Sequence, residues 1–319
     1  VGPLMVIVQK VTSLAFNIHD GLTKQEIELT KNQKQYAVKV FPTPLEYFSY
    51  VLQFPTIMAG PILFYNDYIA FIKGEDVIRD PSPTVPVLKK VCLSIICALI
   101  FTRFLSVYPL DELKDDYFVE RTSLTYKFWY LNIVTTLVRF KYYFAWTIAD
   151  ATCNNAGIGF NGYDRNGNAK WDRISNIDIL KFEFGTNLRE SIEAWNMGTN
   201  RWLRMLVYER VNRYATMFTY ALSAVWHGFY PGYYLTFASG ALFTFAARTV
   251  RRHVRGHFTG NSEMKIFYDI LTLITTRLVM AYITFPFVLL DFETSIRIYC
   301  NTYFCLHILA LLALYIVPR

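Results

Sequence analysis

A histidine lies near the middle of an uncharged stretch, residues 214–247, that contains no Lys, Arg, Asp or Glu. About 20 apolar residues span a bilayer, so this stretch is long enough to lie in lipid. His227 is followed by Gly and Pro residues, which interrupt helices. An ionisable group in a membrane is a functional candidate. A neutral imidazole there could accept a proton from an alcohol, and a purely structural hydrogen bond is the alternative.

Asn196 is the second residue of chemical interest. It lies in residues 187–211, where apolar side chains recur near helical spacing against a face of Arg and Glu. This pattern predicts an interfacial or partly embedded helix, with the carboxamide along or beside the apolar stripe. A buried amide without partners costs about 1–3 kcal/mol. We therefore expect Asn196 to bond either a neighbouring helix or a reacting group, and a nearby amide could orient His227 or the electrophile.

The composition indicates a membrane setting for both residues. Hydrophobic residues make up 53% of the chain and aromatic residues 17%, which is high for a soluble globular protein. Three further segments approach the length of a span: residues 91–110, 271–290 and 298–318.

Other apolar segments carry features that argue against simple spans. Residues 124–149 hold Lys127, Arg139 and Lys141, so we expect this segment to bury against protein or to lie near an interface. Residues 4–16 and 45–65 are short or interrupted by Pro and Gly, which suits broken or re-entrant helices.

The chain is expected to form one membrane domain over residues 1–319, because no Pro-, Gly- or Ser-rich linker divides it. Its first apolar stretch lacks a cationic leader and is therefore not expected to be a signal peptide. We expect the domain to be partial, with upstream helices absent from this sequence.

The net charge of +7 comes from 32 basic and 25 acidic residues. Basic residues collect where helices are expected to leave the membrane: Arg248, Arg251, Arg252, Arg255, Lys89 and Lys90. We interpret them as cytoplasmic topology signals, although they could also contact anionic headgroups or a phosphate-bearing cosubstrate. A nucleic-acid partner would need a basic face outside lipid, and we expect none.

The other flank of the uncharged stretch is basic as well, with Arg201, Arg204, Arg210 and Arg213. The charge bias therefore leaves open whether the stretch is a bent span or a re-entrant pair of helices.

No metal site is expected. The five cysteines show no metal-ligand spacing, and apolar packing is their expected role. Residues 164–175 begin like a calcium-binding loop, but Ala169 stands where Gly is needed and Ser175 where a bidentate Glu is needed. We interpret this loop as an ordinary connector.

Two motifs are Glu193-Ala194-Trp195-Asn196 and the later Trp226-His227-Gly228-Phe229-Tyr230-Pro231-Gly232-Tyr233-Tyr234. Together they resemble the membrane-bound O-acyltransferase family, and most closely its lysophospholipid acyltransferase branch of type 1 and type 2. Further segments extend this resemblance through nearly the whole chain: residues 2–5, 59–61, 141–146 and 154–160.

The resemblance implies an all-α, polytopic fold with an internal catalytic chamber. It implies long-chain acyl-CoA as a cosubstrate from the cytosolic side, a lysophospholipid from the membrane or lumenal side, and no permanently bound cofactor. The acceptors would be lysophosphatidylethanolamine, lysophosphatidylserine or lysophosphatidylcholine, and the location the endoplasmic reticulum membrane. By match to the motifs, His227 and Asn196 take the catalytic positions.

The expected mechanism is direct acyl transfer, in which His227 removes the proton of the glycerol hydroxyl and the oxygen attacks the thioester. Asn196 would hold the imidazole or donate to the developing oxyanion. Ser223 stands one helical turn before His227, but this spacing also suits simple backbone bonding, so we expect no acyl-enzyme.

Five aromatic residues are candidates for lining the chamber: Trp195, Trp226, Tyr230, Tyr233 and Tyr234. Interfacial belts explain Trp and Tyr equally well, and we favour that interpretation for most of them individually. His307 is the rival intramembrane histidine, although no Gly or Pro break lies beside it.

Three other functions are kept open. A family member acting on a sterol, a diacylglycerol or a peptide would keep the histidine and change the acceptor. A transporter would need paired interruptions in two related halves, and no second segment like residues 226–232 occurs. A receptor or scaffold without catalysis is the third.

Overall fold

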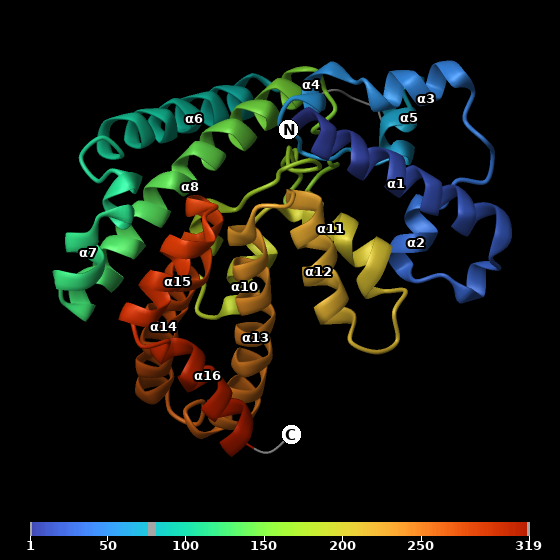
Figure 1. Ribbon diagram of the computed structural model, residues 1–319. Coiled ribbons are helices and arrows are strands. Elements are labelled where there is room, and N and C mark those ends of the chain that lie inside the picture. The colour runs from blue at the N-terminus through green and yellow to red at the C-terminus, as the bar shows by residue number, and fades with distance from the viewer. Residues whose placement is uncertain (1, 76–80, 318–319) are drawn as a thin grey trace. The chain divides into compact units, whose positions relative to one another are not determined.

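The computed structural model describes residues 2–75 and 81–317 (Figure 1). In this part of the chain the regular structure is helical, and the only β-type pairing is an isolated bridge between Tyr163 and Ala169. The expectation of an all-α protein is confirmed.

The helices follow one another along the chain, with a long irregular segment, residues 156–178, between the eighth and ninth α-helices. The α-helices are α1 (Gly2–Thr23), α2 (Lys31–Tyr36), α3 (Pro44–Val51), α4 (Phe54–Ile57), α5 (Tyr65–Lys73), α6 (Thr84–Phe104), α7 (Asp116–Arg121), α8 (Leu124–Asn155), α9 (Ile179–Glu183), α10 (Leu188–Ala194), α11 (Met197–Leu203), α12 (Ala215–His227), α13 (Pro231–Val254), α14 (Ser262–Leu289), α15 (Phe292–Asn301) and α16 (Cys305–Ile316). The shorter helical turns are η1 (Glu26–Glu28), η2 (Leu110–Lys114), the π-helix η3 (Arg204–Tyr208) and η4 (Arg255–His257).

Among the described residues, α6 and α14 are long and apolar enough to cross a membrane. The pair α15 and α16 passes the same test together but is bent by 71°, so it is either one broken span or a re-entrant loop. The predicted segment 91–110 is displaced toward the carboxyl end of the chain, because the helix α6 begins at Thr84 and ends at Phe104. The predicted segment 298–318 is interrupted at Tyr303 and Phe304, whose φ angles are positive, and residue 318 lies outside the described residues.

The short apolar segments behave as expected for interrupted helices. Residues 45–65 contain α3 and α4 and then an irregular stretch before α5. Residues 4–16 belong to the longer helix α1.

The chain divides into two compact units. The first comprises Val1–Cys97, Tyr142–Asp178 and Trp195–Ala215, and the second comprises Ala98–Lys141, Ile179–Ala194 and Thr216–Arg319. The expectation of a single domain over residues 1–319 stays a prediction.

In the first unit, α1 packs one face against a core formed by α3, α5 and the end of α8. Leu14 is buried in this core beside Tyr50, Leu63 and Cys153. Lys10 is also fully buried. Its Nζ donates hydrogen bonds to the carbonyl oxygens of Tyr50, at 2.9 Å, and of Val51, both at the carboxyl end of α3. The last carbonyls of a helix have no partner within the helix, so a buried ammonium can satisfy them.

In the second unit, α13 packs between α14 and α16 (Figure 1). His307 on α16 connects the three helices. Its Nε2 lies 3.0 Å from the Ser239 hydroxyl on α13, and its Nδ1 lies 3.0 Å from the Tyr282 hydroxyl on α14.

The charges of α8 are accommodated largely as the sequence predicts. Arg139 forms two hydrogen bonds with Glu183 on α9, at 2.9 and 3.0 Å, and Arg277 on α14 bonds the same carboxylate at 2.9 Å. Lys127 is buried, whereas Lys141 is exposed. The carboxylate of Glu183 is partly buried, and its two guanidinium partners compensate its charge.

Candidate active site

The motif around His227 forms the turn of a helical hairpin in the second unit. Helix α12 ends at His227, and α13 begins at Pro231 after Gly228, whose φ of +122° suits glycine. Pro231 stands at the first position of its helix, where a missing N–H leaves no helical bond unmade. The predicted break in the uncharged stretch is confirmed.

Three side-chain contacts show that α12 and α13 run antiparallel. Thr216 accepts a hydrogen bond from Arg248 at 3.1 Å, and the hydroxyls of Tyr220 and Thr244 lie 2.7 Å apart. The third contact is a stack of His227 on Phe237. The two ends of the uncharged stretch therefore lie side by side, which favours a re-entrant pair over a bent span.

Aromatic rings surround the imidazole of His227. Its ring centre lies 5.1 Å from that of Phe237 in a stacked arrangement and 4.9 Å from that of Phe287 on α14, edge to face. Tyr233 and Trp226 lie at 5.4 and 4.7 Å. Within the described residues no group hydrogen-bonds to either ring nitrogen, and the side chain is partly exposed. Apolar surroundings disfavour the imidazolium and keep this ring neutral, which is the form that a general base has before it takes a proton.

Sequence reasoning missed Phe237 and Phe287 as neighbours of His227. Phe237 could have been found, because it follows Tyr230 and Tyr233 at helical spacing on the same face of α13. Phe287 comes from α14, and no local pattern indicates its position. Of the five predicted lining residues, Trp226 and Tyr233 contact the imidazole, and Tyr230 contacts Tyr233 at 5.9 Å. Tyr234 is exposed on α13.

His307, the rival intramembrane histidine, differs from His227 in its bonding. Both of its ring nitrogens lie at hydrogen-bond distance from hydroxyls. Its ring also contacts the rings of Phe243, Tyr299 and Phe304. This histidine has the contacts of a residue that holds helices together.

Ser223, the rejected nucleophile, is buried in α12 at 6% exposure. The part of the chain that the structure describes contains no hydrogen bond between Ser223 and His227. This agrees with a mechanism without an acyl-enzyme, which stays a prediction.

Asn196 belongs to the first unit and lies at a break between two short helices. The prediction of one continuous helix over residues 187–211 is wrong, because α10 ends at Ala194 and α11 begins at Met197. Asn196 has φ +46° and ψ +53°, a left-handed conformation that Asn adopts more readily than most residues.

The carboxamide of Asn196 is bonded by a residue from a distant loop. Nδ2 of Asn176 donates to Oδ1 of Asn196 at 3.0 Å. The preceding Trp195 packs its indole against Tyr142, Tyr143 and Trp146, with ring centres 5.7, 6.0 and 5.0 Å away. The predicted lining residue Trp195 is thus part of an aromatic cluster with α8.

The loop that carries Asn176 is anchored by a partly buried ion pair between Lys90 and Asp150. Nζ of Lys90 lies 2.6 Å from Oδ2 of Asp150 and 2.7 Å from the carbonyl oxygen of Trp171. The Ser175 hydroxyl donates to the same Asp150 oxygen at 2.6 Å. Lys90, interpreted from sequence as a topology signal, therefore also has a structural role.

The loop that resembles a calcium-binding motif contains a turn at Asp164. Oδ1 of Asp164 accepts the backbone N–H groups of Asn166 and Asn168, each at 2.8 Å. Asx turns of this kind need no metal. In the described ranges, no group of three or more His, Cys, Asp and Glu side chains could hold a metal ion.

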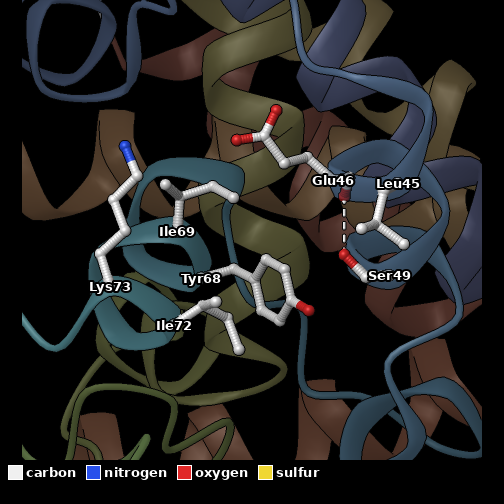
Figure 2. A pocket seen from close by; sticks show the side chains of 7 residues that line it. All are labelled: Leu45, Glu46, Ser49, Tyr68, Ile69, Ile72 and Lys73. Carbon is white, nitrogen blue, oxygen red and sulfur yellow. Dashed lines mark hydrogen bonds between the residues drawn. The ribbon is translucent and has the colours of Figure 1, made fainter.

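A cavity of about 340 Å³ opens between α3 and α5 in the first unit (Figure 2). Tyr68 lies across its centre, and among the described residues that line it Glu46 and Lys73 are charged. None of the predicted site residues lines this cavity, so it is separate from the candidate site.

The chain is similar in sequence to several known proteins. "Lysophospholipid acyltransferase 6" of Drosophila melanogaster is 54% identical over 100% of this chain and 46% of its own length. The human proteins "Membrane-bound glycerophospholipid O-acyltransferase 1" and "2" are each 42% identical over 99% of this chain, and over 67% and 64% of their own lengths. The chain thus spans about half to two thirds of the length of these relatives.

The sequence profile of the membrane-bound O-acyltransferase family matches residues 1–290. This range contains Asn196, the hairpin turn with His227, and Phe287. The chain belongs to the membrane-bound O-acyltransferase family.

Proposed function

We propose that the protein transfers a long-chain acyl group from acyl-CoA to the free glycerol hydroxyl, at sn-2, of a lysophospholipid. The acceptors are lysophosphatidylethanolamine, lysophosphatidylserine or lysophosphatidylcholine, and the enzyme works as a multi-pass protein of the endoplasmic reticulum membrane. Family membership and the names of the relatives support this acceptor class. The main observation in support of the proposed chemistry is the position of the His227 imidazole. It is partly exposed, lies among aromatic rings, and has no hydrogen-bond partner among the described residues.

In this proposal His227 is the general base. A ring nitrogen accepts the proton of the lysolipid hydroxyl as its oxygen attacks the thioester carbonyl carbon. The resulting tetrahedral intermediate collapses, the carbon–sulfur bond breaks, and the proton passes from the imidazolium to the departing thiolate of coenzyme A. No covalent acyl-enzyme forms. The rings around His227 keep the imidazole neutral before each turnover.

Asn196 is the second catalytic residue of the proposal, either orienting the imidazole or donating to the oxyanion. Trp226, Tyr230 and Tyr233 would provide apolar walls next to the base. Tyr234 and Trp195 are proposed as more peripheral lining residues.

The test supplies radiolabelled oleoyl-CoA to the full-length protein in detergent or liposomes. The acceptor panel contains the three lysophospholipids, a sterol and a diacylglycerol. We expect ester product with at least one lysophospholipid. His227→Ala should lower turnover by about 100- to 10,000-fold, the range of general-base catalysis.

Other outcomes would identify other functions. Product with sterol or diacylglycerol alone would assign a different acceptor within the family. Uptake of label into liposomes without ester formation would favour transport. Full turnover in the His227→Ala protein would remove the base from the mechanism.

A further inference from the structure

We infer that Asn176 is a positioning residue that turns the carboxamide of Asn196 so that its N–H groups, rather than its oxygen, face the substrate. This inference rests on the proposed function, because it assigns Asn196 the role of a hydrogen-bond donor to the thioester oxygen. Three hydrogen bonds join Asn176 to residues 196–198.

The orientation of Asn176 is fixed by a backbone group. The N–H of Gly198 lies 2.9 Å from one side-chain atom of Asn176. A backbone N–H can only donate, so this atom must be Oδ1. The backbone carbonyl of Asn176 accepts a further hydrogen bond from the N–H of Met197 at 2.8 Å. Asn176 is 3% exposed, so it has little freedom to turn.

The orientation of Asn196 follows from that of Asn176. With Oδ1 facing Gly198, Nδ2 of Asn176 is the atom that lies 3.0 Å from Asn196. Nδ2 is a donor, so the Asn196 atom facing it must be the acceptor Oδ1. The Nδ2 group of Asn196 then points elsewhere, and among the described residues it has no acceptor. Asn196 is partly exposed, so these two N–H groups remain available to a substrate.

The available N–H groups favour the oxyanion role over the orienting role for Asn196. A residue that orients a histidine by accepting its ring N–H must offer an oxygen, and the oxygen of Asn196 already uses one of its two lone pairs for Asn176. A residue that stabilises an oxyanion must offer N–H groups, which Asn196 does. The left-handed backbone at Asn196 is held by the same neighbour, because Asn176 bonds the two residues that follow it.

The test replaces Asn176 with Asp in the full-length protein. One carboxylate oxygen can still accept from Gly198, but the other cannot donate to Asn196. Asn196 should then turn its Nδ2 toward the carboxylate and present its oxygen to the thioester. We expect kcat to fall about as far as in Asn196→Ala, by about 100- to 1,000-fold. The KM for oleoyl-CoA should change by no more than about twofold, because transition-state binding alone is affected.

A matched control is Asn166→Asp, the same exchange at an exposed position of the same loop, and it should leave kcat unchanged. The second readout is a double-mutant cycle. The Asn176→Asp/Asn196→Ala protein should be no slower than Asn196→Ala alone, because Asn176 acts through Asn196. Asn176→Ala must show the same non-additivity, which keeps the test decisive where the Asp variant does not fold.

The outcomes separate this inference from the proposed function. A wild-type protein without acyl transfer would overturn the proposed function itself. An active wild-type protein in which the Asn176 and Asn196 effects multiply, or in which Asn176→Asp matches Asn166→Asp, would overturn only the role of Asn176. The same conclusion follows if neither Asn176 variant yields folded protein, since its role would then be in folding.

Discussion

The imidazole of His227 stacks on the ring of Phe237, with 5.1 Å between ring centres and 25° between ring planes. The contact joins the last residue of α12 to a residue two turns into α13. It fixes the plane of the imidazole without using either ring nitrogen. A general base held in this way keeps both nitrogens for chemistry.

Phe237→Leu should reduce turnover without abolishing it. Leucine keeps most of the apolar contact but removes the ring, and an aromatic pair contributes about 0.5–1.5 kcal/mol, or roughly a two- to twelvefold change in rate. The kcat of the variant is compared with that of Phe245→Leu, a substitution on the same helix. Equal kcat values in both variants would show that the stack does not orient the base.

His307→Phe should lower stability and leave turnover per folded molecule near the wild-type value. Phenylalanine keeps the aromatic volume but leaves the hydroxyls of Ser239 and Tyr282 without their partner. Such a loss costs about 1–3 kcal/mol. The melting temperature in detergent measures the effect, and Ser239→Ala, which removes one bond only, should show a smaller decrease. Complete loss of turnover in folded His307→Phe protein would give this histidine a catalytic role.

Gly232→Ala should disrupt the hairpin turn. A Cβ at this position would lie 2.1 Å from the carbonyl oxygen of Pro286 and 2.8 Å from Cα of Leu290, so the backbone of α13 or α14 must move. Both stability and turnover should fall, as measured by melting temperature and ester formation. Gly256→Ala is the control, because a Cβ there meets no atom within 4 Å. Wild-type behaviour of Gly232→Ala would mean that the approach of α13 to α14 is not required.

Asp20→Asn should destabilise the first unit at neutral pH. Burial raises the pKa of the Asp20 carboxyl, but hydrogen bonds and charge from Arg210, together with Lys24, outweigh burial and lower the pKa below its usual value. The ionised carboxylate is 1% exposed, and one of its oxygens lies 2.8 Å from Arg210. Removing one partner of such a pair costs about 3–5 kcal/mol.

The stabilisation by the Asp20 carboxylate should depend on pH in a defined direction. A lowered pKa in the folded state contributes stability above the unfolded pKa of about 3.9, and this stability is lost as the pH falls through the folded value. The stability difference between wild type and Asp20→Asn should therefore be full at pH 7 and shrink below about pH 4. Asp111→Asn, which breaks an exposed pair with Lys114, should cost about 0.2–1 kcal/mol at most. A difference that stays constant with pH would contradict the role of the charge.

Short sequence patterns predicted the structural features that depend on residues close together in the chain. Gly228 and Pro231 predicted the break after His227, which lies between α12 and α13. Arg139 inside an apolar segment predicted a protein partner, which is Glu183.

Tertiary contacts produced the features that the sequence did not reveal. Helical spacing over residues 187–211 predicted one helix, but hydrogen bonds from the distant Asn176 stabilise the left-handed break at Asn196. No Gly or Pro marks the break between α15 and α16, where Tyr303 and Phe304 adopt positive φ. Periodicity reports which face of a helix is apolar, and it does not report bonds that arrive from elsewhere in the chain.

The paired contacts along α12 and α13 also influence the direction in which the His227 imidazole points. Thr216, Tyr220 and His227 lie on one face of α12, and their partners Arg248, Thr244 and Phe237 follow at the same spacing in reverse. A shift of α12 by one residue would rotate that face by about 100° and break all three contacts together. Thr216 lies ~16 Å along the helix from His227. Polar side chains two and three turns away along α12 therefore help to set the direction in which the His227 imidazole points.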